Sequence, residues 1–339
     1  MALSSDEIIK REIIDNLGYK HGNIKLRIFP QSSREDQNLF SDGGLTFGFD
    51  GVSYGSCDAC WYTDEEWVDG FNNKTIDKKP VIALEGTDAL NRNSGGNALY
   101  QRFHHALGAV RNGLVGVYYL KKGTTKIQPD LYGMAYYASQ VEKGNYLVTD
   151  DLGVVKGLLE RYDNKDSFNS FINNHLEEMH KIFNTKFQSL YKGDWEEFAK
   201  KRSTIIKDNY VIKYAGRSRR NFTDGSQRAG HIAVGEMFLT KYYFYNKKFY
   251  YLFPKMTRED IELLDKNKNT DKEWFLLRNE PNVFIKTIDD VEGVGGKIKK
   301  ELLQIKDEPL KGNAFTTFNK YTQEIVSKLE SGEYRISEK

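Results

Sequence analysis

Two short apolar segments of this chain each contain a single carboxylate, and this pattern constrains the fold more than any other feature of the sequence. The first, CDACWY, spans residues 57–62 and contains Asp58, and the second, PVIALEGT, spans residues 80–87 and contains Glu85. Both have the composition of buried β-strands, where a charged side chain requires a specific role. Because side chains alternate along a strand, Glu85 and Thr87 share one face, and paired strands lie about 4.8 Å apart. The pattern predicts two adjacent strands whose carboxylates converge.

The rest of the N-terminal half alternates between helical and β-type patterns. Apolar residues that recur every fourth position predict a helix over residues 5–17, which ends at Gly18. Short β-type runs separated by polar turns follow over residues 24–84. A helix is expected over residues 97–110 and a buried strand over residues 114–120. These patterns predict an α/β fold with a mixed central sheet flanked by helices.

A long helical pattern occupies residues 151–207, and the α/β pattern then resumes. Strands are expected over residues 210–214 and 249–253, with a helix over residues 232–243 between them. The chain is accordingly expected to have three parts: residues 1–150, the N-terminal part of the core with the metal site; residues 151–207, a helical insertion; and residues 208–339, the C-terminal part of the core with a DNA-recognition segment.

Composition indicates a globular chain and excludes several classes of protein. The 339 residues are 39% hydrophobic and 29% charged, and the formal net charge of +2 requires any strongly basic surface to be local. No apolar run approaches the roughly 18 to 20 residues of a membrane span, so a soluble protein is expected. Two cysteines cannot form a disulfide framework, and the charged N-terminus is unlike a signal peptide, so we expect a cytoplasmic location.

Asp58 and Glu85 have the chemistry of a divalent metal site. Carboxylate oxygens suit Mg²⁺, which takes one or two carboxylates and keeps several waters that a substrate phosphate can displace. The alternative is structural: Asp58 caps a turn after Gly55 and Ser56, and Glu85 ends its strand with its carboxylate in solvent. A second acidic run at residues 64–69 either contributes a further ligand or forms a solvated loop.

The arrangement resembles the PD-(D/E)XK nuclease superfamily and, within it, the type II restriction endonucleases. The matching pattern is a strand Asp, then a hydrophobic strand that ends in Glu-x-Lys, then a polar turn and a helix; here it is Asp58 followed by KPVIALEGTDALNRNSGGNALYQRFHHAL. The resemblance implies a restriction-endonuclease-like fold in which Asp58 and Glu85 bind Mg²⁺. It also implies that Gln101 and Arg102 face the scissile phosphate.

The resemblance covers residues 45–125 well and residues 210–255 loosely, and it departs from the family at one position. Thr87 stands where the family has the lysine that positions the attacking water. Either another polar group performs this role or the site is altered, and Thr87 is retained as a candidate catalytic residue.

A basic segment in the C-terminal third is the candidate nucleic-acid interface. Arginine suits phosphates and guanine, whereas asparagine and glutamine suit adenine. The candidate DNA-binding residues are Lys213, Arg217, Arg219, Arg220, Asn221, Gln227 and Arg228. We favour phosphate contacts for Arg217 and Arg219 and base contacts for Asn221 and Gln227; the alternative is a solvated basic loop.

Together these features predict a Mg²⁺-dependent, sequence-specific endonuclease of double-stranded DNA. A two-fold homodimer is expected, because a palindromic duplex has two equivalent scissile phosphates. Two alternatives remain open. One is a catalytically inactive DNA-binding protein of the same fold, and the other is a glycoside hydrolase that uses the paired carboxylates.

Overall fold

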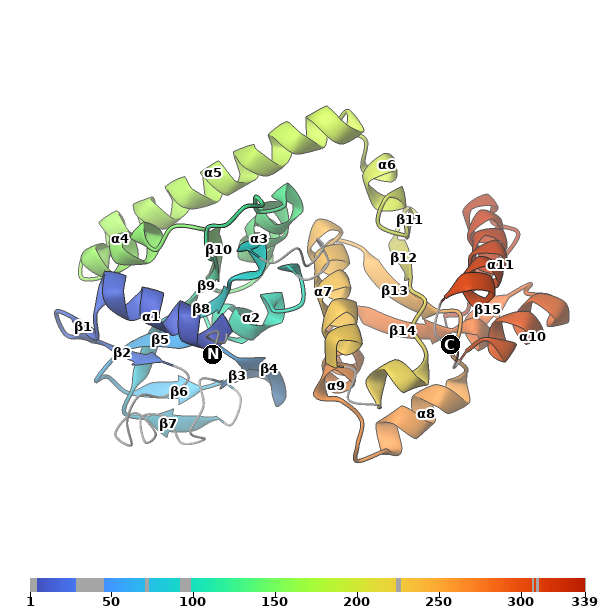
Figure 1. The fold of residues 1–339 in the computed structure, drawn as a ribbon, viewed down its shortest axis with the longest axis horizontal. Helices are drawn as coiled ribbons and strands as arrows, with labels where there is room; N and C mark the ends of the chain where they lie inside the picture. Colours follow the sequence, from blue (N-terminus) through green and yellow to red (C-terminus); the bar gives the residue numbers. More distant parts are fainter. Residues whose placement is uncertain are drawn as a thin grey trace. The chain divides into compact units, whose positions relative to one another are not determined.

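The structure, a computed structural model, describes residues 5–28, 46–70, 73–91, 99–223, 227–306, 308 and 311–338. The chain forms two compact units, Met1–Leu190 and Tyr191–Lys339, and each has its own β-sheet (Figure 1). The prediction of a mixed α/β fold with a central mixed sheet flanked by helices is confirmed.

The first unit contains a six-stranded sheet in the order β1-β2-β5-β8-β9-β10. Its strands are β1 (Lys20–His21), β2 (Ile24–Ile28), β5 (Ala59–Thr63), β8 (Lys79–Thr87), β9 (Val115–Leu120) and β10 (Asn145–Thr149). Neighbours from β1 to β8 are antiparallel, whereas β8, β9 and β10 run parallel to one another. The two expected carboxylate-bearing segments therefore lie side by side, with β8 where the antiparallel and parallel halves of the sheet meet.

Helices cover this sheet closely because its central strands are apolar on both faces. Every residue of β9 is buried, as is β8 from Pro80 onward. The sheet is contacted by α1 (Ser5–Leu17), α2 (Phe103–Arg111) and α3 (Pro129–Val141). A side chain at Gly116 of β9 would bring its Cβ within 2.6 Å of Val110 Cγ2, so glycine there allows α2 to approach the sheet.

The expected helix over residues 5–17 coincides with α1. The expected helix over residues 97–110 is α2, which begins later, at Phe103, while Asn97 lies outside the described residues.

Two small antiparallel ribbons and two further helices complete the first unit. The ribbons are β3 (Thr46–Phe49) with β4 (Val52–Ser56) and β6 (Trp67–Asp69) with β7 (Lys74–Ile76), and the helices are α4 (Gly153–Arg161) and α5 (Lys165–Tyr191). Along α5 the buried residues recur every three or four positions, which confirms the helical pattern seen in the sequence. These residues are Ile172, Leu176, Met179, Phe183 and Phe187.

The second unit contains a four-stranded sheet in the order β11-β12-β13-β14. Its strands are β11 (Thr204–Ile206), β12 (Tyr210–Tyr214), β13 (Lys248–Phe253) and β14 (Val283–Thr287). β11 is antiparallel to β12, whereas β12, β13 and β14 run parallel to one another. The helical pattern expected to extend through residue 207 was wrong at its end, because Thr204, Ile205 and Ile206 are β-branched and pair with β12.

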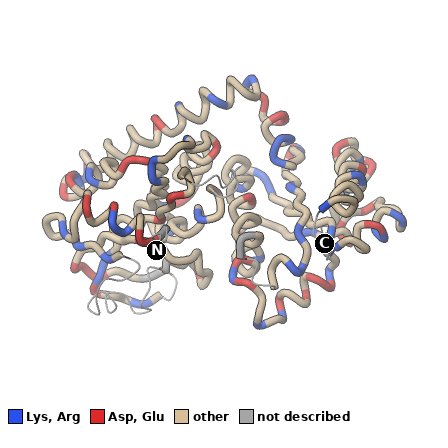
Figure 2. The backbone as a smooth tube through the Cα atoms, in the orientation of Figure 1, with Lys and Arg blue, Asp and Glu red and all other residues tan. Residues whose placement is uncertain are grey.

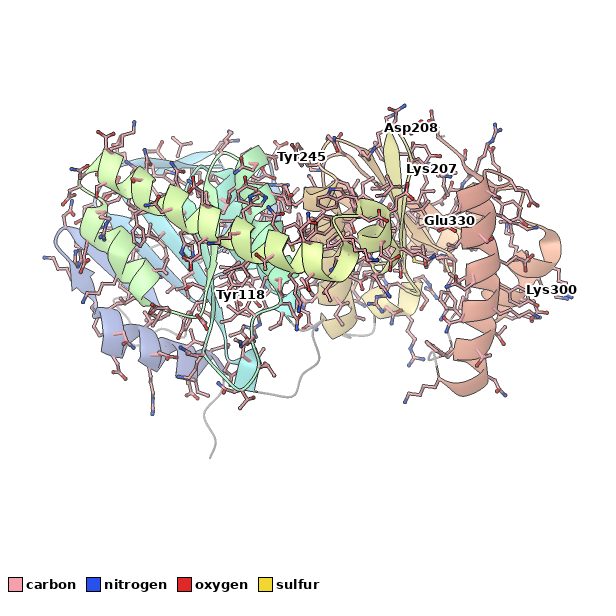
Figure 3. All side chains as sticks on the ribbon, turned by 90° about the horizontal axis from the view of Figure 1, so that it is seen from above. Tyr118, Lys207, Asp208, Tyr245, Lys300 and Glu330 are labelled. Atoms are coloured by element: carbon pink, nitrogen blue, oxygen red, sulfur yellow. The ribbon has the colours of Figure 1, made fainter. Side chains whose placement is uncertain are left out.

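Helix α7 (Gln227–Tyr243) connects β12 to β13, and further helices follow along the chain (Figure 1). The helix α6 (Trp195–Lys200) precedes β11, whereas α8 (Arg258–Lys266), α9 (Lys272–Asn279), α10 (Gly296–Gln304) and α11 (Gly312–Ser331) follow β13, with a short ribbon of β15 (Val291–Glu292) and β16 (Arg335–Ile336). Residues of β12, β13, α10 and α11 share one core, among them Ile212, Leu252, Leu302 and Ile325. Lys207 Nζ donates to Glu330 O at 2.8 Å, which joins β11's end to α11 (Figure 3).

Candidate functional site

The strand pairing places Asp58 and Glu85 next to each other. Ala59, the first residue of β5, pairs with Leu84 of β8, so Asp58 lies immediately before β5 and opposite Glu85. The Asp58 backbone N donates to Leu84 O at 2.9 Å. Its carboxylate Oδ2 accepts a hydrogen bond from Gly86 N at 2.7 Å. These two bonds hold the Asp58 side chain beside the C-terminal part of β8.

Both carboxyl groups are buried, and burial dominates their protonation. Glu85 is 1% exposed and Asp58 is 5% exposed. Burial raises the pKa of Glu85 to about 8, against the opposing charge and hydrogen bond of Arg102. Burial and then the charge of Glu85 raise the pKa of Asp58, although the Gly86 N–H and Arg102 oppose this shift. The neighbouring cations and donors of the protein thus offset only part of the cost of two buried negative charges.

Two side chains from the start of α2 contact Glu85. Arg102, in the turn just before α2, places Nη1 3.0 Å from Glu85 Oε1 and 3.7 Å from Asp6 Oδ1. His105, in the first turn of α2, places Nδ1 3.2 Å from Glu85 Oε2. Each Glu85 oxygen therefore faces a nitrogen from residues 102–105.

His105 is a site residue that the sequence analysis missed. It stands three positions after Arg102, and residues with that spacing lie on the same side of a helical turn. That spacing was the signal that could have found it, since Arg102 was already a candidate.

Thr87 and Gln101 lie at the margins of this cluster. Thr87 ends β8, and its Oγ1 accepts a hydrogen bond from Ala89 N at 3.2 Å. Lys121 follows β9 and donates its backbone N to Thr87 O at 2.8 Å, but its ammonium lies 2.7 Å from Glu12 Oε2. Gln101 lies partly exposed in the turn before α2. The lysine next to Thr87 across the sheet is thus engaged by α1.

The donor set fits a hard divalent cation. Asp58 and Glu85 together present two carboxylates, whereas Arg102 is the permanent cation in contact with Glu85. Oxygen donors with an excess of negative charge are what Mg²⁺ requires. Burial raises the pKa of both carboxyl groups, because a buried carboxylate without enough positive charge nearby retains its proton.

Asp64 and Glu65, in the second acidic run, lie on a solvated surface. Asp64 and Glu65 are exposed just after β5 and pair with lysines. Asp64 contacts Lys25 and Lys78, and Glu65 Oε2 lies 2.7 Å from Lys79 Nζ. Hydrogen bonds from these lysines lower the pKa of Asp64 to about 2. Asp64 and Glu65 therefore lack the burial that distinguishes Asp58 and Glu85.

In the second unit, the residues of the basic segment differ in how exposed they are. Lys213 lies in β12, is 5% exposed, and donates from Nζ to Arg202 O at 2.6 Å; burial lowers its pKa. Arg219 Nε lies 3.4 Å from Asp260 Oδ1, while Arg220 is exposed and Arg217 is partly exposed. Lys213 is thus part of the interior, and the three arginines lie nearer the surface.

Asn221 has a local structural contact. Its Oδ1 accepts a hydrogen bond from Ser218 N at 2.9 Å, which caps the short helix η4 (Arg219–Phe222). The acceptor of this amide is consequently engaged within its own turn. Gln227 and Arg228 begin α7, and their side chains lie outside the described residues. Lysine and arginine are interspersed with aspartate and glutamate throughout both units (Figure 2).

Comparisons of the chain with known protein families, with curated proteins and with solved structures find no match. Within the described part of the chain, none of the helices combines the length and the apolar character needed to cross a lipid bilayer.

Proposed function

We propose that this chain is a Mg²⁺-dependent, sequence-specific endonuclease of double-stranded DNA, of the type II restriction class. One observation carries the proposal: Asp58, immediately before β5, and Glu85, in the adjacent strand β8, are both buried and lie opposite each other, and Arg102 pairs with Glu85. Two buried acids beside an arginine require a further cation or a proton, and a divalent metal ion at this place would supply the chemistry for hydrolysis of a phosphodiester.

The order of elements around the two acids supports membership of the PD-(D/E)XK superfamily. Asp58 precedes β5, Glu85 lies near the end of the hydrophobic strand β8, and a turn then leads to α2. This is the order that the resemblance in sequence implies. A restriction-endonuclease-like fold is therefore part of the proposal.

Each residue of the site has a proposed role. Asp58 and Glu85 would hold Mg²⁺, which when bound lowers the pKa of a water and offsets negative charge on the phosphate. The side chain of Arg102 is 37% exposed, so its guanidinium can stabilise an incoming phosphate oxygen while it remains paired with Glu85. The role of the motif lysine is assigned to neither Thr87 nor Lys121. Thr87 has no ammonium group, and the ammonium of Lys121 is paired with Glu12.

DNA binding is assigned to the basic segment of the second unit. Arg217, Arg219 and Arg220 are proposed to contact phosphates, with Gln227 and Arg228 as candidate contacts at the start of α7. Lys213 is given a packing role, because its ammonium binds a carbonyl of its own unit. A homodimer that cuts both strands belongs to the same proposal.

One observation favours a second candidate, a DNA-binding protein of this fold that no longer cleaves. Thr87 occupies the lysine position, and its hydroxyl oxygen accepts from Ala89 N within the turn. This candidate predicts DNA retention without products.

The test is incubation of the protein with plasmid DNA of known sequence in MgCl₂ and in EDTA. Discrete fragments in MgCl₂ alone are expected, and mapping their ends would give the recognition sequence and the cut position. Gel retardation without fragments would favour the non-cleaving binder. If DNA is neither bound nor cut, the proposal is wrong, and assays on glycosides would then test the remaining alternative.

The basic segment is tested separately through the salt dependence of binding. Arg220→Ala should weaken binding to all sequences and reduce the salt slope by about 1, because one fewer counterion is released. Arg220→Lys is the matched control and should keep the slope. An unchanged affinity and slope for alanine variants of all three arginines would remove the segment from the interface.

A further inference from the structure

Two fully buried tyrosines on the neighbouring strands β9 and β10 differ in one respect. Tyr146 of β10 donates its hydroxyl to Phe103 O at 2.6 Å, and its ring stacks on Phe103 with centroids 4.1 Å apart. Tyr118 of β9 is 0% exposed, yet its hydroxyl has no hydrogen-bond partner within the described residues. A buried hydroxyl without a partner is costly and uncommon in a folded protein, so Tyr118 requires an explanation.

The position of Tyr118 relates it to the candidate site. Tyr118 pairs with Glu85 across the parallel strands β8 and β9, and paired residues of adjacent strands project to the same face of a sheet. The charges of Glu85, Arg102 and Asp58 all act on its hydroxyl, whose pKa is raised first by burial and then by Glu85. Figure 3 labels Tyr118 within the first unit. The unpartnered hydroxyl therefore belongs to the surroundings of the two buried acids.

The chemistry of this hydroxyl defines what can partner it. A phenol with a raised pKa remains protonated and donates a hydrogen bond to an oxygen lone pair. The site of Asp58 and Glu85 is one where oxygen-rich ligands are proposed to enter: the water shell of the ion and the oxygens of a phosphodiester.

We propose that the Tyr118 hydroxyl is a further ligand-binding group of this site, and that it donates a hydrogen bond to an oxygen atom brought in with the ligand. The inference rests on the proposed function. The oxygen belongs either to a water bound to Mg²⁺ or to the DNA phosphate, and the experiment separates these two sources. On either assignment, the hydroxyl is unsatisfied in the ligand-free protein and satisfied in the complex.

The test compares Tyr118→Phe with the matched control Tyr146→Phe. In EDTA, Tyr118→Phe should melt at the same or a higher temperature than wild type, because the change removes a polar atom without a partner. Tyr146→Phe should melt lower, by about 2 to 4 °C, because it loses the buried hydrogen bond to Phe103 O. A lower melting temperature for Tyr118→Phe would mean that the hydroxyl is used within the fold, which would overturn the proposal.

The ligand arms use MgCl₂ alone and MgCl₂ with plasmid DNA. Loss of the melting-temperature rise produced by MgCl₂ in Tyr118→Phe would identify a water of the ion. A normal rise with cleavage slowed about 10- to 100-fold would identify the phosphate oxygen, since hydrogen bonds to charged groups have about that effect. Tyr146→Phe should behave as wild type in both arms. A Tyr118→Phe variant with a normal rise and normal cleavage would contradict the proposal.

Failure of the proposed function is seen separately, in the wild-type protein. A wild type that neither gains stability from MgCl₂ nor cleaves DNA would refute the nuclease proposal and, with it, the ligand assigned to Tyr118. A wild type that does both, with a Tyr118→Phe variant indistinguishable from it, would refute only the role of Tyr118.

Discussion

The two ends of strand β5 carry the same kind of side chain in opposite electrostatic states. Asp58 immediately precedes the strand, is 5% exposed, and has a raised pKa. Asp64 immediately follows it, is exposed, and has a pKa lowered to about 2 by Lys25 and Lys78. Burial raises the first value and lysine hydrogen bonds lower the second. The comparison teaches that position in the sheet, and not residue type, decides the direction in which the pKa of an aspartate is shifted.

The same contrast holds for the glutamates nearby. Glu85 is buried beside Arg102 and His105, whereas Glu65 is exposed and has its pKa lowered by the hydrogen bond from Lys79. The exposed pairs contribute little, because solvent screens them. The chain thus contains matched buried and exposed acids, and substitutions at both kinds of position test the comparison.

The largest expected effect is on cleavage. Glu85→Gln or Asp58→Asn should reduce Mg²⁺-dependent DNA cleavage on the order of 10³-fold or more, because metal-based charge stabilisation supplies several kcal/mol. The exposed counterparts, Glu65→Gln and Asp64→Asn, should retain wild-type rates. Rates are measured on plasmid DNA in MgCl₂. Full activity of either buried-site variant would break the comparison.

The next effect is on how stability depends on pH in EDTA. The folded pKa of Glu85, about 8, lies above its ordinary value of 4.5, so the folded state retains a proton that the unfolded chain releases. The free energy of unfolding should therefore fall as pH rises from about 4.5 to about 8, by an amount on the order of a few kcal/mol.

Denaturant titrations across this range measure the slope, and Glu85→Gln is expected to flatten it. Asp64, at the other end of β5, should have the opposite effect on the free energy of unfolding, and at lower pH. Because the folded pKa of Asp64 is lowered, its contribution is present above about 3.8 and is lost as pH falls toward 2. A wild type whose stability is constant between pH 5 and pH 8 would show that Glu85 is already compensated.

A smaller effect is expected from the ion itself. An ion present at about ten times its dissociation constant stabilises the folded state by about 1.4 kcal/mol, which raises the melting temperature of a unit this size by about 3 to 5 °C. Wild type and Asp64→Asn should show this rise in MgCl₂, and Asp58→Asn should not. An equal rise in Asp58→Asn would place the ion elsewhere.

The smallest expected effect is the loss of a surface ion pair. Asp64→Asn removes the exposed contacts with Lys25 and Lys78, and the free energy of unfolding at pH 7 should stay close to the wild-type value, because solvent screens these contacts. Urea unfolding at pH 7 measures it. A larger loss would mean that the exposed end of β5 is more than a solvated surface.

Local patterns in the sequence were sufficient for much of the fold. The helix over residues 5–17, the helical periodicity of α5 and the apolar segments that became β8 and β9 all follow from spacing and composition. A lone carboxylate in an apolar segment also drew attention to Asp58 and Glu85. These features depend on neighbours within a few residues, which is the range over which periodicity carries information.

Contacts between distant segments were decided only by the tertiary structure. Lys213 and Asn221 belong to a segment with the composition of a DNA-binding site. In the structure, however, the ammonium of Lys213 is buried and donates to a backbone carbonyl, and the amide of Asn221 caps a turn. His105 contacts Glu85, and Tyr118 pairs with Glu85 across the sheet, with a hydroxyl for which the described part of the chain offers no hydrogen-bond partner. Sequence by itself determined most of the strands and helices and the two apolar segments that contain a single acid, because those properties are local. The groups that surround each acid were set by strand register and helix packing, which bring together residues far apart in the chain.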